Sequence, residues 1–345
     1  RLGDPLPADD PARGGGQDRM NPVATRDMGH MPAPPRSDGR RGLAEVLTPI
    51  RPAGCWMLLA AVLMSTPTTA AKAPPLPLTL PAEAWQPLQK TLDAELQERL
   101  AERVKRNPEW RRLLEQRRMA VGVVDLSEPA IPRFAHLNGE VEMYAASLPK
   151  IAILLAAFHQ IEHGQLVRSP EVDADMEAMI RVSSNAAATR MIDRLGGLKA
   201  VNRVLQDPRY GLYDPKGPGG LWVGKRYAKS GPRLPDPVNG ISHAATVDQA
   251  CRFYYLLATG RLISRAASRE MLELLADPGL KHKFVAPLSQ RAPKARLHRK
   301  SGTWNPWHAD SVLVWGPNWR RYILVAMVES TDGEQILRRL VPEVE

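Results

Sequence analysis

Ser147 and Lys150 are the residues whose types and spacing point most directly to chemistry. They precede an apolar stretch, 151–158, which predicts a helix buried on nearly every side. Residues three apart share a helix face, so Lys150 is expected beside Ser147, and Pro149 is tolerated because it falls in the first turn. A lysine whose pKa is lowered by burial could take the serine proton and create a nucleophile. The positive end of the helix would favour an oxyanion there.

Taken alone, this pair is weak evidence. A chain of this length contains roughly one S-x-x-K pattern by chance, and this chain has that one copy. A serine that caps a helix, followed by a solvent-facing lysine, would give the same pattern. The interpretation therefore depends on other polar motifs.

Two further motifs occur where a lysine-assisted serine hydrolase would need them. Ser183-Ser184-Asn185 interrupts two predicted helices, 173–181 and 186–195, so Ser183 and Asn185 can both point into a cleft. Lys300-Ser301-Gly302 lies on a predicted strand, 297–303.

A second Lys-Ser-Gly, at 229–231, competes with the copy at 300–302. It is followed by Pro232 inside a segment rich in proline and glycine, 208–243, which predicts a turn. The copy at 300–302 begins a strand that two more strands follow, so we prefer it.

In this order, the three motifs resemble those of class A β-lactamases and penicillin-binding proteins, over residues 82–345. The resemblance implies that Ser147 becomes acylated, that Lys150 acts as base, and that Ser183 relays a proton to the leaving nitrogen. It also implies substrate-binding roles. Asn185 would orient Lys150 and the substrate amide, and Gly302 would let the substrate backbone approach. Other substrate contacts would come from Lys300 and Ser301, which would bind a carboxylate, and from the N–H groups of Ser147 and Thr303, which would form an oxyanion hole.

The chain departs from this family in ways that bear on turnover. The middle motif has Ser184 where the family has aspartate, and Ser183 follows Ser147 more closely than in class A enzymes. The family's deacylating glutamate, in an E-x-x-x-N pattern, has no equivalent, because residues 198–246 contain no glutamate. Asp236, three residues before Asn239, is a candidate base with a shorter side chain in a shifted register. Without a base, an acyl-enzyme would hydrolyse slowly.

The remaining sequence predicts one α/β domain of α+β type. Expected helices are 88–104, 247–259, 264–276 and 333–340, and expected strands are 119–126, 134–137, 297–303, 311–315 and 322–329. Strands at both ends with helices between them predict an antiparallel sheet built from both ends of the chain, packed by helices and joined to an all-helical subregion.

The N-terminal residues predict export. Residues 1–50, rich in Pro, Gly and Arg, are expected to be disordered or to precede a signal peptide. Arg40, Arg41 and Arg51 precede an apolar run, 55–64, which is too short to span a membrane and is followed by small residues. This pattern is typical of a signal peptide over 51–73, although an uncleaved anchor is an alternative. Residues 74–81 read as a proline-rich linker before the domain at 82–345. A periplasmic or secreted location follows.

Composition limits the partners. The 345 residues are 43% hydrophobic and 24% charged, as expected for a globular protein, and the net charge of +10 comes largely from scattered arginines. This charge favours association with an anionic cell-wall or membrane surface at most, and no nucleic acid. If Cys55 is removed with the leader, Cys251 alone remains, so no internal disulfide is expected.

Two rival interpretations remain open. His159-Gln160-Ile161-Glu162-His163 matches a zinc-binding pattern, H-x-x-E-H, although histidines also favour the last turn of a helix. A binding protein of the same fold, without turnover, is the other. We expect a monomeric serine hydrolase that acts on a β-lactam or a cell-wall peptide, with no cofactor and no metal.

Overall fold

A computed structural model describes residues 73–345, all of which belong to the second of two compact units, Thr66–Glu345. The predictions for an N-terminal extension and a signal peptide concern residues 1–73 and lie almost entirely outside the described residues. Within residues 73–345, none of the helices is long and apolar enough to cross a membrane.

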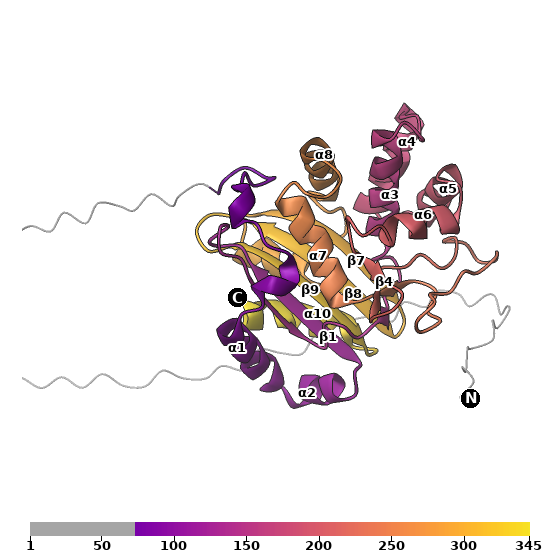
Figure 1. The fold of residues 1–345 in the computed structure, drawn as a ribbon. Coiled ribbons are helices and arrows are strands. Elements are labelled where there is room, and N and C mark those ends of the chain that lie inside the picture. The colour runs from indigo at the N-terminus through magenta and orange to yellow at the C-terminus, as the bar shows by residue number, and fades with distance from the viewer. Residues whose placement is uncertain (1–72) are drawn as a thin grey trace, which may run out of the picture. The chain divides into compact units, whose positions relative to one another are not determined.

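Five antiparallel strands form the main sheet, in the order β2-β1-β9-β8-β7 (Figure 1). The N-terminal strands β1 and β2 lie beside the three C-terminal strands, so the prediction of a sheet built from both ends of the chain is confirmed. The bounds are β1 Met119–Asp125, β2 Arg133–Leu137, β7 Arg296–Trp304, β8 Trp307–Trp315 and β9 Arg321–Glu329.

Alternating side chains give the sheet two apolar faces. On β9, Ile323 and Val325 join the core that contains α7 (Val247–Ala258), whereas Leu324 and Ala326 join the core on the other face. That second core contains the helices α1, α2, α9 and α10, and Figure 1 shows α7 and α1 on opposite sides of the sheet. Their bounds are α1 Ala94–Lys105, α2 Pro108–Glu115, α9 Val285–Arg291 and α10 Gly333–Val344.

A helical subregion lies beyond one side of the sheet (Figure 1). At its centre is α3, in which every residue from Lys150 to Phe158 is buried, as the apolar sequence predicts. The surrounding helices are α4 Pro170–Arg181, α5 Asn185–Arg194, α6 Leu198–Leu205 and α8 Arg265–Leu275. The described residues also form two small sheets, each of two short strands. In one, β3 Met143–Tyr144 pairs with β6 Ala244–Ala245, and in the other, β4 Tyr213–Asp214 pairs with β5 Gly219–Gly220.

The predicted helix 88–104 is wrong at its start. The chain forms a short 3-10 helix, Leu88–Thr91, and the α-helix begins at Ala94 after Asp93, whose carboxylate accepts from Leu96 N at 2.7 Å. Leu92 lies between them and forms a parallel bridge with Phe134 of β2. A helix cap and a strand contact therefore override a regular leucine spacing.

The proline-rich segment 74–81 packs against the domain and is not a free linker. Leu78 is buried, and its N–H donates to Ala258 O at 2.7 Å. The Trp315 indole donates to Pro74 O at 2.6 Å. These contacts join segments far apart in the chain and could not be predicted from local sequence.

His136 of β2 and Asp248 of α7 join the sheet to its covering helix. Their Nδ1 and Oδ1 atoms are 2.6 Å apart, and this hydrogen bond is the main cause that raises the pKa of His136 from its usual 6.5. A raised pKa in the folded state means that the protonated imidazole stabilises the fold. This contribution is complete below pH 6.5 and is lost as the pH rises through the raised pKa.

We expect His136→Asn, which keeps a neutral donor but removes the charge, to lower the free energy of unfolding by about 1–2 kcal/mol at pH 5.5. The difference should shrink at pH 8.5, where the parent imidazole is neutral as well. Urea titrations at both pH values measure it, with His163→Asn at the exposed end of α3 as control. An unchanged difference at both pH values would contradict the assignment.

Candidate active site

Ser147 lies in a tight turn between β3 and α3, which we call the nucleophile turn, residues 145–149. At the start of the turn, Ala145 N donates a hydrogen bond to His243 O at 2.7 Å. A second hydrogen bond, from Leu148 N to Ala145 O at 3.0 Å, closes the turn. Ala146 has a φ of +50°, a left-handed conformation that is uncommon for a residue with a side chain. Such a conformation persists where surrounding contacts hold it, and it is frequent at functional sites.

Gly302 of β7 allows this turn to reach the sheet. A Cβ atom at Gly302 would lie 2.1 Å from Ala145 O and 2.7 Å from Ser147 N, so no other residue fits without moving the turn. The sequence-based expectation was that glycine makes room for the substrate backbone. In the structure that room is filled by the protein's own turn, so Ser147 N lies against Gly302, the residue before Thr303, whose N–H is the other predicted oxyanion donor.

Lys150 begins α3 and is fully buried. Its Nζ contacts Ser183 O at 2.6 Å, Ser183 Oγ at 3.2 Å and Asn185 Oδ1 at 2.7 Å. Burial lowers the pKa of Lys150 to about 7. Among the described residues no carboxylate hydrogen-bonds or forms an ion pair with this ammonium group. A large fraction of Lys150 is thus neutral at physiological pH and able to accept a proton.

Tyr227 and His243 form an aromatic wall beside Lys150, which the sequence did not predict. Lys150 Nζ lies 4.5 Å from the centre of the Tyr227 ring, and this ring stacks on His243 at 4.3 Å. The Tyr227 hydroxyl donates to Ala146 O at 3.2 Å, so the same residue also supports the nucleophile turn. Burial lowers the pKa of His243 to about 3, which leaves its ring neutral. Tyr227 lies in the long segment 208–243 and belongs to no sequence motif, so its position beside Lys150 could not be predicted.

The break between α4 and α5 presents Ser183 and Asn185 as predicted. Ser183 has a φ of +59°, which directs the chain out of one helix before the next begins. Ser184 caps α5, because its side chain accepts from Ala187 N at 3.2 Å. Serine and aspartate are both favoured helix caps, which accounts for Ser184 where the family has aspartate.

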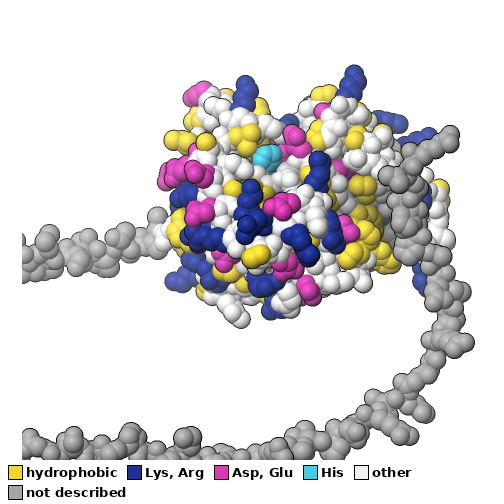
Figure 2. All heavy atoms as spheres, turned by 90° about the horizontal axis from the view of Figure 1, so that it is seen from below, with side chains coloured by type: hydrophobic (Ala, Val, Ile, Leu, Met, Phe, Trp, Pro, Cys, Tyr) yellow, Lys and Arg dark blue, Asp and Glu magenta, His cyan; other side chains and the backbone are white. Residues whose placement is uncertain are grey.

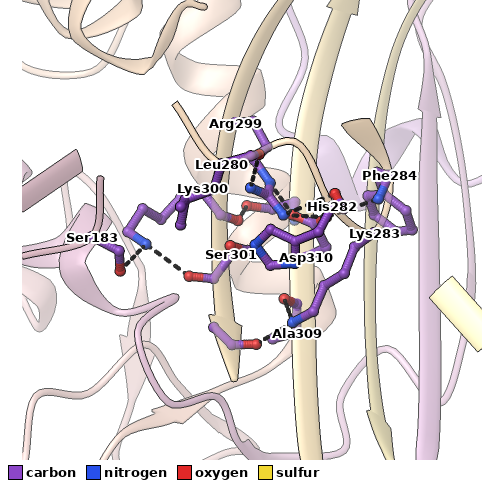
Figure 3. A network of polar contacts seen from close by, with 12 residues as sticks. Ser183, Leu280, His282, Lys283, Phe284, Arg299, Lys300, Ser301, Ala309 and Asp310 are labelled. Carbon is purple, nitrogen blue, oxygen red and sulfur yellow. Dashed lines mark hydrogen bonds and ion pairs between the residues drawn. The ribbon is translucent and has the colours of Figure 1, made fainter. Parts of the chain in front are cut away.

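Lys300 approaches Ser183 from β7 (Figure 3). Its Nζ is 2.9 Å from Ser183 Oγ and 2.7 Å from Ser301 O. Burial, followed by the charge of Lys150, lowers the pKa of Lys300 well below its usual value. The Ser183 hydroxyl therefore lies between two lysine nitrogens, the arrangement that a proton relay requires.

The opposite face of β7 carries a separate polar cluster (Figure 3). Arg299 forms a buried ion pair with Asp310, with nitrogen–oxygen distances of 2.7 and 2.9 Å. Lys283 donates to Gly302 O at 2.5 Å and to Thr303 Oγ1 at 2.7 Å, and burial lowers its pKa to about 8. This cluster fixes the end of β7. Lys283 was not predicted, since it belongs to no motif.

Asp236 is not placed as a deacylation base. Its Oδ1 accepts from Tyr213 OH at 3.1 Å and from Val238 N at 2.9 Å, and its Oδ2 accepts from Ile241 N at 2.5 Å. Both carboxylate oxygens are thus used to close the turn 236–241. Among the described residues Asp236 has no hydrogen bond to Ser147 or to Lys150, so the structure gives the candidate base a structural role.

The zinc-binding interpretation has no support in the described residues. His159 Nδ1 is hydrogen-bonded to Tyr210 OH at 2.8 Å, and His163 Nδ1 to His159 O at 2.7 Å. The two rings stack on each other at 4.3 Å. In residues 73–345, no group of three His, Cys, Asp or Glu side chains is arranged to hold a metal ion.

The buried position of Lys150 leads to a prediction about its titration. In protein labelled with ¹³C at the lysine ε-carbons, the signal lost in Lys150→Met should titrate with a midpoint of about 7. Asn185→Leu should lower that midpoint further, because it removes an acceptor that stabilises the charged form. A midpoint above about 9, close to that of a lysine in water, would contradict the structure.

Comparisons with known proteins concern the fold and the family. The chain has the fold of PBP-A, with 19% identity and a TM-score of 0.55 over 73% of this chain and 95% of that one. A point mutant of PBP-A, in an acyl-enzyme complex with penicillin G, has 19% identity and a TM-score of 0.56 over 73% of this chain and 96% of that one. A beta-lactamase from Sphaerobacter thermophilus has 17% identity and a TM-score of 0.55 over 72% of this chain and 94% of that one. No curated protein sequence matches the chain.

The family assignment comes from sequence. The family described as "Beta-lactamase enzyme family" matches residues 107–178 and 174–342, which together include all three polar motifs and the whole main sheet. The matched residues make up more than half of the 345-residue chain. The resemblance seen in the motifs is thus confirmed, and the chain belongs to the beta-lactamase enzyme family.

Proposed function

We propose that this protein is a serine hydrolase that opens an amide, in a β-lactam or a peptidoglycan-type peptide, through an acyl-enzyme on Ser147. The family and the fold support a hydrolase of β-lactamase type. The observation that carries the mechanism is the Ser183 hydroxyl between Lys150 Nζ and Lys300 Nζ, next to a nucleophile turn that rests on Gly302.

In the first step, Ser147 Oγ attacks the carbonyl carbon while its proton passes to neutral Lys150. The oxyanion that develops is held by the N–H groups of Ser147 and Thr303, each worth about 3–4 kcal/mol in comparable sites. The proton then moves from Lys150 through Ser183 Oγ to the leaving nitrogen, and the C–N bond breaks. Asn185 Nδ2 remains available for a substrate carbonyl, since only its Oδ1 is used by Lys150.

Hydrolysis of the acyl-enzyme is proposed to be the slow step. A water molecule needs a base near the ester, and Lys150 is surrounded by carbonyl, amide, hydroxyl and aromatic groups, without a carboxylate hydrogen-bonded to it among the described residues. This observation also favours the second candidate, a penicillin-recognising protein that is acylated and turns over little. Acylation occurs in both cases, so the rate of deacylation separates them.

Intact mass after incubation with benzylpenicillin tests this function. We expect the parent protein to gain one penicillin mass that persists for minutes or longer, and Ser147→Ala to gain none. Loss of the antibiotic without an adduct would mean fast deacylation by a base that is still to be assigned. Neither adduct nor loss, in folded protein, would overturn the β-lactam proposal.

A second variant tests the assignment of Asp236. Asp236→Asn should leave the deacylation rate within about threefold of the parent, whereas loss of a general base costs about 100-fold or more. It should lower the free energy of unfolding by about 1–3 kcal/mol, because backbone N–H groups lose a charged acceptor. Adduct decay followed by mass, together with urea unfolding, measures both. A large change in decay would restore Asp236 as a base.

We also propose that the protein is secreted or periplasmic. The support is the apolar run 55–64, which Arg40, Arg41 and Arg51 precede and small residues follow, ahead of a domain whose site suits a cell-wall or antibiotic amide.

A further inference from the structure

A short loop, residues 225–233, lies against the catalytic lysine; we call it the basic hairpin. An antiparallel bridge pairs Lys225 with Arg233 at its base. Midway along it, Tyr227 provides the ring beside Lys150 and the hydroxyl bonded to Ala146 O. The basic hairpin therefore contacts both Lys150 and the nucleophile turn through Tyr227, so the residues on either side of Tyr227 lie close to the site.

Four cations and no acidic residue occur within the basic hairpin. Arg226 forms an ion pair with Asp193 of α5 at 2.6 Å, which fixes the hairpin to the helical subregion. Lys225, Lys229 and Arg233 have no carboxylate within ion-pair distance among the described residues, and Lys229 and Arg233 are exposed. By contrast, on the face seen in Figure 2, Lys and Arg side chains are interspersed with Asp and Glu.

Two carboxylates, Glu142 and Asp236, are occupied by other groups. Glu142 accepts from Gly220 N at 3.0 Å and from Asn239 Nδ2 at 2.8 Å, and burial raises its pKa to about 7. Asp236 is buried and closes its own turn. Neither carboxylate therefore neutralises Lys225, Lys229 or Arg233 of the basic hairpin.

The basic hairpin and β7 reach the nucleophile turn at different atoms. Tyr227 contacts Ala146 O, whereas Gly302 lies against Ala145 O and Ser147 N. A substrate whose carboxylate is bound by Lys300 would leave the cations of the basic hairpin free for a second anionic group. Unpaired cations at a cleft entrance raise the local concentration of such a substrate and favour its binding.

We propose that the basic hairpin recognises a carboxylate on the acyl side chain of the substrate, so that this protein prefers amides with a negatively charged acyl substituent. The inference rests on the proposed function, because it assumes that an amide is acylated at Ser147. It identifies the class of side chain that the site accepts.

Three penicillins that differ at one side-chain carbon provide the test: benzylpenicillin carries hydrogen there, ampicillin an ammonium group and carbenicillin a carboxylate. We expect the second-order acylation rate for carbenicillin to exceed that for ampicillin by roughly tenfold in 20 mM salt, and less in 500 mM salt. The double variant Lys229→Gln/Arg233→Gln should reduce this ratio to about threefold or less. The ratio is obtained from time courses of intact mass.

The matched control is Lys105→Gln/Arg111→Gln, which removes the same charge from exposed positions on α1 and α2. It should keep the parent ratio, so an equal loss in both double variants would assign the preference to net charge and overturn the inference. A parent that does not distinguish the three penicillins would overturn it as well.

Binding to Ser147→Ala keeps the inference testable if no penicillin acylates the parent. Absence of acylation counts against the proposed function, whereas the order of dissociation constants for the three penicillins, measured by calorimetry, still reports on the basic hairpin. Tighter binding of carbenicillin, reduced by Lys229→Gln/Arg233→Gln, would support recognition of the anionic group. Equal binding, or no binding of any of the three, would overturn it.

Discussion

Two buried lysines that share one hydroxyl impose the constraint on which this structure depends. Lys150 and Lys300 approach Ser183 Oγ to 3.2 and 2.9 Å, and burial together with their mutual repulsion disfavours a state with both charged. A surface could not maintain this arrangement, since water would solvate both ammonium groups. The site therefore requires a large apolar environment. The buried residues of α3 that follow Lys150 supply one part of it, and the main sheet supplies the part around Lys300.

The rest of the fold acts as a support for that arrangement. On the far face of β7, the ion pair of Arg299 with Asp310 and the contacts of Lys283 hold the strand that carries Lys300. Breaking a buried ion pair of this kind typically costs about 3–5 kcal/mol, because one charge is left without a partner. On the other side, the Tyr227 ring lies 4.5 Å from Lys150 Nζ, and among the described residues no carboxylate is hydrogen-bonded to this nitrogen. Burial itself lowers the pKa of Lys150 to about 7.

Sequence alone predicted the parts of the site that belong to regular elements. Ser147 precedes a helix that is apolar all round, Ser183 and Asn185 interrupt two helices, and Lys300 belongs to a Lys-Ser-Gly motif on a strand that two more strands follow, so each has a local signal. Tyr227 and Lys283 were missed because they lie in loops and act through contacts with distant segments. The start of α1 was misplaced for a similar reason: Leu92 continues the leucine spacing but contacts Phe134 instead of the helix core.

The short distance between Gly302 and the nucleophile turn also limits how this enzyme can change over generations. Even alanine at position 302 would have to displace Ala145 O, and with it Ser147, the proposed nucleophile. Position 302 is thus closed to gradual substitution, while the exposed tip of the loop at 228–232 can vary without touching the turn. New substrate preferences are therefore expected to arise by drift in that loop, with the strand beneath the serine left unchanged.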